Sequence, residues 1–177
     1  SKDHELEYKD RVMKGLKILA SKAGVHGMIG GQVIDTCVLE GITMDENNKE
    51  DILNKLKNMY NLKTSGLIQG SMMIGATLAG ASRSQVSLIE EMASNIGLAF
   101  QIQDDILDLT STTEKIGKPV HSDERNKKIT YVTLLGLEKA KEEVKSYSDK
   151  SLNILAELEK SNLFLEELIR YLIHRVM

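Results

Sequence analysis

Apolar residues recur three and four positions apart along most of this chain, which is the spacing of helices with one buried face. No stretch alternates apolar and polar residues as a half-buried strand does. The pattern therefore predicts an all-α protein, a helical bundle. We expect helices over residues 12–23, 52–60, 67–80 and 89–108, and two or three more after residue 128, the last of them over residues 165–176.

Polar and glycine-containing stretches separate these predicted helices. Loops are expected at residues 40–49 and 110–128, and residues 63–66 should end or bend the helix that precedes them. Ser84 or Ser87 should cap the helix that ends in the acidic residues. The small residues at 27–31 and 70–80 predict that neighbouring helices approach closely there.

The composition indicates one domain over residues 1–177, with a single proline and no tryptophan. A net charge of −3 and 4% aromatic residues argue against a nucleic-acid partner. No run of apolar residues reaches the roughly 20 that a membrane span needs. Cys37 is the only cysteine, so no internal disulfide can form, and we expect a cytoplasmic protein with this thiol in the core.

Acidic side chains gather inside the otherwise apolar stretch at residues 100–108. On a helix Asp104, Asp105 and Asp108 share an arc of roughly 100° with Gln101, while Ile102 and other apolar residues occupy the opposite side. Acidic pairs on helices are usually only solvated, but the apolar flanks make that less favoured here. Three carboxylates close together need cations, and oxygen-only ligands favour Mg²⁺ completed by phosphate oxygens.

A diphosphate held by such ions also needs cationic donors, because carboxylates alone would repel it. Lys63, Lys118 and Lys128 are the candidates, and Thr64 and Gln101 could add neutral hydrogen bonds. Any one lysine is more often an ordinary surface residue. The four histidines have no zinc spacing, and no strand precedes the glycines at 27–31 as a dinucleotide fold requires.

Five blocks, in this order, resemble the trans-isoprenyl diphosphate synthases, most of all the bacterial farnesyl diphosphate synthase (geranyltranstransferase) type. They are residues 30–35 (GGQVID), 63–65 (KTS), 100–108 (FQIQDDILD), 117–118 (GK) and 128–131 (KITY). The third block resembles the second aspartate-rich motif of that family. The resemblance covers nearly the whole chain and implies a bundle of the isoprenoid synthase type.

The resemblance also implies an activity, a Mg²⁺-dependent prenyl transfer in isoprenoid biosynthesis. An allylic diphosphate ionises, isopentenyl diphosphate attacks the carbocation, and a proton is lost. It implies that Asp104 ligates Mg²⁺, with Asp105 and Asp108 as further ligands or partners of metal-bound water. The residues that it places on the allylic diphosphate or the pocket wall are Lys63, Thr64, Gln101, Lys118, Lys128, Gln32 and Asp35.

Two motifs of that family have no match in this sequence, namely a first aspartate-rich motif followed by paired arginines and an N-terminal segment for isopentenyl diphosphate. We therefore expect the C-terminal part of a synthase domain, without its N-terminal helices, inactive alone and prone to self-association as a remnant of a homodimer. The main alternative is a non-catalytic helical partner subunit of a prenyl synthase. A terpene cyclase is a nearer rival in chemistry, but residues 30–35 and 63–65 favour the synthase.

Overall fold

The computed structural model describes residues 2–38, 47–110, 128–158 and 162–174. Its helices are α1 (Lys2–Ala23), α2 (Met28–Val33), α3 (Lys49–Tyr60), α4 (Gly66–Leu78), α5 (Arg83–Thr110), α8 (Tyr131–Leu135), α9 (Leu137–Glu157) and α10 (Leu163–His174), with two π-helical segments, η1 (Ile34–Val38) and η2 (Asn61–Ser65). None of these residues is in a strand, so the predicted all-helical class is confirmed.

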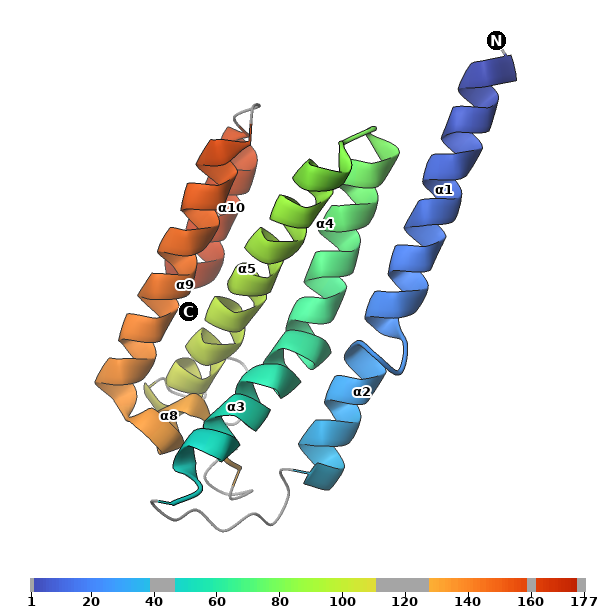
Figure 1. Cartoon of the computed structure of the whole chain (residues 1–177). Helices are drawn as coiled ribbons and strands as arrows, with labels where there is room; N and C mark the ends of the chain where they lie inside the picture. Colours follow the sequence, from blue (N-terminus) through green and yellow to red (C-terminus); the bar gives the residue numbers. More distant parts are fainter. Residues whose placement is uncertain (1, 39–46, 111–127, 159–161, 175–177) are drawn as a thin grey trace.

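The helices lie side by side almost in chain order (Figure 1). Helices α1 and α2 pack against the continuous run α3–η2–α4, and α5 packs on the other side of that run. Helix α9 then covers α5, and α10 contacts both α9 and α5. The 28-residue α5 is the central helix, because it contacts α3, η2, α4, α8, α9 and α10.

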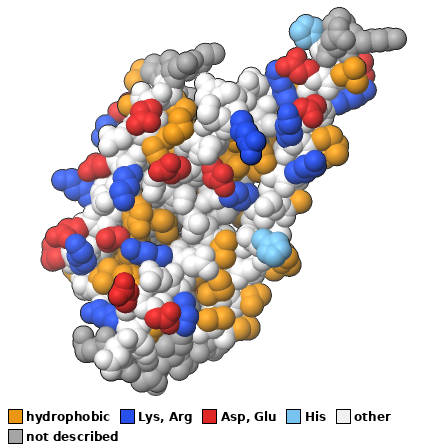
Figure 2. All heavy atoms as spheres, in the orientation of Figure 1, with side chains coloured by type: hydrophobic (Ala, Val, Ile, Leu, Met, Phe, Trp, Pro, Cys, Tyr) orange, Lys and Arg blue, Asp and Glu red, His pale blue; other side chains and the backbone are white. Residues whose placement is uncertain are grey.

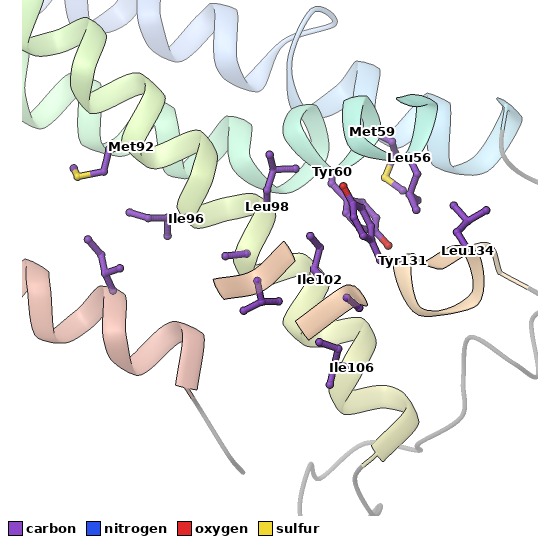
Figure 3. Close-up of a cluster of buried hydrophobic side chains, with 14 of the residues drawn as sticks. Leu56, Met59, Tyr60, Met92, Ile96, Leu98, Ile102, Ile106, Tyr131 and Leu134 are labelled. Carbon is purple, nitrogen blue, oxygen red and sulfur yellow. The ribbon is translucent and has the colours of Figure 1, made fainter. Parts of the chain in front are cut away.

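The hydrophobic core lies around α5, between α3, α8, α9 and α10 (Figure 3). Ile102 of α5 is fully buried and packs among side chains from these neighbours. Within the cluster the rings of Tyr60 and Tyr131 stack with centroids 5.8 Å apart and planes at 23°. The apolar side of α5 that the sequence predicted is therefore the inner side of the bundle.

Helices α1 and α2 contribute little to this core. Gly15 is the one buried residue among those described in α1, and many large apolar side chains on α1, α2 and η1 are exposed. In Figure 2 apolar side chains follow the edge of the molecule formed by these elements. The exposed large apolar residues of this part of the chain, with Val25 in the connection between α1 and α2, are Leu6, Tyr8, Met13, Leu16, Leu19, Val25, Ile29, Val33 and Val38.

Membrane insertion through a helix finds no support in the described part of the chain, where no helix combines the length and apolarity that a span requires.

Three local predictions differ from the structure. Residues 63–66 do not end the preceding helix, since Asn61 and Gly66, the residues at the two ends of η2, keep right-handed helical angles. Ser82, and neither predicted serine, caps α5, because its Oγ accepts from the Gln85 amide (3.3 Å) and its own amide donates to Gln85 Oε1 (2.8 Å). Cys37 is exposed on η1, which has no buried residue.

Candidate functional site

The π-helical segment η2 carries Lys63 and Thr64 between α3 and α4. A π-helical turn widens the backbone spiral by one residue, and such turns occur frequently at functional sites. Here the extra residue changes the direction in which side chains leave the run without breaking it. The sequence predicted that the helix ends or bends at this point, and the structure shows a continuous helical run that contains a π-helical segment.

Two glycines on neighbouring helices let η2 fit between them. A Cβ atom added at Gly31 of α2 would lie 2.3 Å from the backbone nitrogen of Lys63. A Cβ added at Gly97 of α5 would lie 2.2 Å from Ser65 Oγ and 2.6 Å from Ser65 Cα. Both distances are far below van der Waals contact, so only glycine lets α2 and α5 approach the segment that carries Lys63 and Thr64.

We therefore expect Gly97→Ala to destabilise the fold by about 1–3 kcal/mol, the usual cost of overpacking a tight contact. Gly75→Ala is the matched control, because a Cβ there meets nothing within 4 Å and alanine is the better helix former. The measurement is the denaturant midpoint of each variant. Equal midpoints for the two variants would contradict the close approach of α5 to η2.

A polar network lies behind η2 and ties it to α1, α4 and α5. Gln69 of α4 accepts a hydrogen bond from Lys22 Nζ and donates Nε2 to Asn61 Oδ1 at 2.9 Å. Ser94 Oγ of α5 donates to the same Asn61 oxygen at 2.6 Å, and Lys22 Nζ also pairs with Glu90 at 2.5 Å. Because buried polar groups are costly when unpaired, this network restricts where η2 can sit.

A small cavity of about 70 Å³ opens on the other side of η2. It lies between η1, the end of α3, η2, α5 and the residues just before α8. The side chains that line it are Asp35, Met59, Tyr60, Lys63, Gln101, Asp105, Lys128, Ile129 and Thr130. Segments as far apart in sequence as residues 35 and 130 therefore meet at one polar pocket.

Two lysines approach one carboxylate in this pocket. Lys63 Nζ lies 2.6 Å from Asp35 Oδ2, and Lys128 Nζ lies 3.9 Å from the same oxygen. Asp35 is the more buried partner, with its side chain 14% exposed against 34% for Lys63 and 49% for Lys128. Asp105 also lines the pocket, so its two lysines face two carboxylates, and their ammonium groups are the donors that the pocket offers to an anionic ligand.

Gln101 connects η2 to the acidic end of α5. Its Oε1 accepts a hydrogen bond of 2.9 Å from Thr64 Oγ1. Asp104 and Asp108 are half-buried and follow Gln101 by three and seven residues, so they lie on the same face of α5. The described lining of the small cavity includes neither carboxylate. Lys63 and Gln101 both line it, and Thr64 is joined to it through Gln101.

Asp105 differs from the other two acids because it is buried, with 6% of its surface exposed. Its Oδ2 accepts a hydrogen bond of 2.6 Å from the Tyr60 hydroxyl and one of 3.1 Å from the Tyr131 amide. The three neighbouring carboxylates predicted from the sequence therefore differ in their surroundings, because Asp105 is buried whereas Asp104 and Asp108 are half-buried. Asp105 lies at the edge of the arc nearest Ile102, and its side chain is buried with the core-facing side of α5.

The donor set fits Mg²⁺ only together with a ligand. Among the described residues, no three His, Cys, Asp or Glu side chains form a group that would hold a metal ion without other ligands. Asp104 and Asp108 offer oxygen atoms alone, and Mg²⁺ characteristically takes one or two protein carboxylates and completes its octahedron with phosphate oxygens and water. The chemistry of these residues therefore suits a magnesium–diphosphate complex better than a free ion.

The remaining predicted site residues are Gln32 and Asp35, which differ in their position relative to the small cavity, and Lys118. Gln32 is exposed on α2 and is not part of the described cavity lining, whereas Asp35, the other predicted pocket-wall residue, lines it. Lys118 lies outside the described residues. Sequence reasoning gave no role to Tyr60 or Tyr131, although the position of each, three residues from a candidate lysine, was a usable signal.

Tyr131 is joined to the site through its backbone amide, and its side chain is not part of the described cavity lining. Its ring is fully buried, and burial, followed by the nearby Tyr147 and Glu143, raises the pKa of its hydroxyl well above the ordinary range for tyrosine. The hydroxyl therefore stays protonated wherever the protein is folded near neutral pH.

Comparison with known proteins identifies the family of this chain. The polyprenyl synthetase family matches residues 6–170. Farnesyl diphosphate synthase of Escherichia coli is 37% identical over 175 residues, which cover 97% of this chain and 56% of that protein. The enzyme of the same name from Geobacillus stearothermophilus is 43% identical over 126 residues, which cover 71% of this chain and 40% of its own.

The fold has close matches among solved structures as well. A geranyltransferase from Helicobacter pylori, solved with magnesium and isoprenyl diphosphate, superposes with a TM-score of 0.73 at 30% identity. The match covers 93% of this chain and 51% of that one. The chain thus spans about half the length of the relatives that it matches.

Proposed function

Because this chain belongs to the polyprenyl synthetase family, we propose that it carries the allylic-diphosphate half of a farnesyl-type prenyltransferase site, as the C-terminal part of a synthase domain. One observation carries the proposal. Lys63, Gln101 and Lys128 come from three separate elements and face one pocket, and Asp104 and Asp108 continue the same face of α5. Cations and carboxylates arranged in this way suit a diphosphate held with Mg²⁺.

The roles that we propose follow from these positions. Lys63 and Lys128 hold diphosphate oxygens as point charges, with Lys118 as a further cation. Thr64 and Gln101 add neutral hydrogen bonds, and Asp35 positions the two cavity lysines between turnovers. Asp104 and Asp108 would hold Mg²⁺, which supplies charge stabilisation to the departing diphosphate when bound.

The reaction that we propose is a condensation in isoprenoid biosynthesis. The carbon–oxygen bond of the allylic diphosphate breaks, and its electron pair leaves with the diphosphate held by Lys63 and Lys128. The double bond of isopentenyl diphosphate then attacks the allylic cation, and loss of a proton restores a double bond. The residues of this chain act on the first step, because their charges oppose the one that develops on the leaving group.

The rival function is that of a non-catalytic helical subunit that supports a separate synthase chain. Such a subunit needs the packing faces of the bundle but not the pocket. The convergence of Lys63 and Lys128 on Asp35 favours the catalytic reading, since a scaffold gains little from two cations at one half-buried carboxylate.

The test is a Mg²⁺-dependent condensation assay with labelled isopentenyl diphosphate and dimethylallyl or geranyl diphosphate. Two proteins are compared, the 177-residue chain and a chimera in which this chain replaces the region of the E. coli farnesyl diphosphate synthase that it matches. We expect product from the chimera and none from the chain alone, whose sequence has no isopentenyl diphosphate motif. A folded but inactive chimera would argue for the subunit, and product from the chain alone would contradict the half-site.

We further propose that the chain self-associates through the exposed apolar residues of α1, α2 and η1, as a homodimer. Patches of this kind are rare on monomers and mark interaction surfaces. Light scattering at micromolar concentration should give at least twice the 19.7 kDa of one chain. Leu16→Glu should lower that mass, and a single-chain mass for the unmodified protein would contradict the association.

A further inference from the structure

We infer that Asp105 is a positioning residue that holds both lysine-bearing segments of the pocket against α5, rather than the ligand of Mg²⁺ or partner of metal-bound water that the resemblance implies. The inference rests on the proposed function, since it concerns the same diphosphate pocket. Its basis is one oxygen atom, Asp105 Oδ2, which accepts hydrogen bonds from the Tyr60 hydroxyl and the Tyr131 amide.

The two donors occupy equivalent places relative to the lysines. Tyr60 is the last residue of α3 and lies three residues before Lys63. Tyr131 is the first residue of α8 and lies three residues after Lys128. The Asp105 carboxylate therefore holds the backbone three residues before Lys63 and three residues after Lys128. Both lysines approach the same oxygen of Asp35.

The Tyr131 amide has a reason to need this acceptor. Thr130 caps α8 by a reciprocal pair of bonds with Thr133, in which each side chain accepts from the other residue's amide, at 3.2 Å and 2.8 Å. Tyr131 is the next residue, and the first amides of a helix have no partner inside the helix. Asp105 Oδ2 satisfies this buried amide, so the start of α8 is tied to α5.

Burial supports the same assignment. Asp105 is 6% exposed and lies beside the stacked rings of Tyr60 and Tyr131, whereas Asp104 and Asp108 on the same helix are only half-buried. A buried carboxylate must be hydrogen-bonded to stay ionised, and two donors at one oxygen meet that need. A magnesium ligand instead needs room for an ion with several water molecules.

The experiment separates positioning from metal binding with the variants Asp105→Asn, Tyr60→Phe and Asp104→Asn. The first readout needs no ligand, namely amide hydrogen exchange over η2 and residues 128–131. We expect Asp105→Asn to speed exchange of the Tyr131 amide about tenfold, because a charge-assisted bond becomes a neutral one. Tyr60→Phe should speed exchange in η2, Asp104→Asn should change neither segment, and Tyr8→Phe on the exposed side of α1 is the control.

The second readout is binding of inorganic pyrophosphate and of Mg²⁺ by calorimetry. Asp105→Asn and Tyr60→Phe should each weaken pyrophosphate binding several-fold at saturating Mg²⁺, about as much as losing one hydrogen bond. The double variant should lose less than the sum of the two single losses, because both changes weaken the same contact. The Mg²⁺ affinity should fall only in Asp104→Asn.

These measurements distinguish failure of the positioning role of Asp105 from failure of the proposed diphosphate site. Unchanged exchange in both segments, or a Mg²⁺ affinity that falls as far in Asp105→Asn as in Asp104→Asn, would overturn the positioning role. Should Asp105→Asn fail to fold, Tyr60→Phe alone decides by its exchange in η2. If the unmodified chain binds no pyrophosphate while the exchange differences persist, the proposed function fails and the attachment of both segments by Asp105 stands.

Discussion

Asp104→Ala is expected to lower kcat of the chimera about a hundredfold or more, which is the order of loss when one preorganised stabilising group is removed from a charged transition state. Asp104 is the acid of α5 that follows Gln101 by one helical turn, on the face that leads away from the pocket lysines. Its removal leaves Mg²⁺ with one fewer carboxylate while substrate oxygens are unchanged. The loss should therefore appear in kcat more than in KM.

Asp10→Ala is the matched control for this prediction. Asp10 is an exposed acid of α1 that pairs with Lys14 at 2.6 Å, in an i, i+4 pair of the kind that contributes little to stability. The assay follows product from labelled isopentenyl diphosphate over a range of Mg²⁺ concentrations. A chimera with Asp104→Ala that keeps the kcat of the Asp10→Ala protein would remove Asp104 from the site.

Lys63→Met is expected to weaken Mg²⁺-dependent pyrophosphate binding tenfold or more, since a charged hydrogen bond contributes about 1.5–3 kcal/mol. Among the described residues, the same change also leaves the 14%-exposed Asp35 with Lys128, at 3.9 Å, as its one cationic partner, so stability should fall as well. The variant Lys63→Met/Asp35→Asn separates the two effects. It should recover most of the stability, because no carboxylate is left unpaired, and none of the binding.

Lys55→Met is the control for Lys63→Met. Lys55 forms a pair with Asp51 of similar length, 2.7 Å, but both side chains are exposed on α3. Loss of that pair should cost about 0.3–0.5 kcal/mol and should not affect pyrophosphate. Calorimetric titration with pyrophosphate and a denaturant melt of each variant give both quantities. Recovery of binding in the double variant would show that Lys63 acts only by neutralising Asp35.

The helical class and the inner face of α5 were readable from the sequence, because both depend on periodicity. Ile102 and Ile106 recur with helical spacing and are buried as that spacing predicts. The convergence of Lys63 and Gln101 was also expected, but from the resemblance of the blocks that carry them. Periodicity alone cannot say which helices become neighbours, since that depends on loops and on contacts between residues far apart in sequence.

The fate of Asp105 shows what periodicity could not supply. Its place at the edge of the acidic arc allowed either a solvent-facing or an inward side chain. The partners that decide the matter, the Tyr60 hydroxyl and the Tyr131 amide, lie 45 and 26 residues away along the chain. A helical wheel of α5 contains neither of these partners. The inward position of the Asp105 side chain therefore follows from the packing of α3 and α8 against α5.

The glycines of α4 also show what the sequence alone could not predict. The small residues of α4 were all expected to admit a neighbouring helix, yet only some do. A Cβ at Gly70 would lie 3.2 Å from Lys22 Cβ of α1, whereas one at Gly75 would meet nothing within 4 Å. Gly75 instead borders an apolar cleft of about 640 Å³ between α4, α5, α9 and α10. The sequence marks where close packing is allowed, and the neighbouring helix determines where it occurs.

The central claim is that the pocket lysines and the acidic face of α5 form one site for a magnesium–diphosphate complex. The most direct test titrates the 177-residue chain with Mg²⁺ by calorimetry, with and without inorganic pyrophosphate, and with sulfate as the control anion. We predict weak Mg²⁺ binding alone and at least tenfold tighter binding with pyrophosphate, because phosphate oxygens complete the coordination sphere. Equal Mg²⁺ affinity in the presence and absence of pyrophosphate would contradict a shared site.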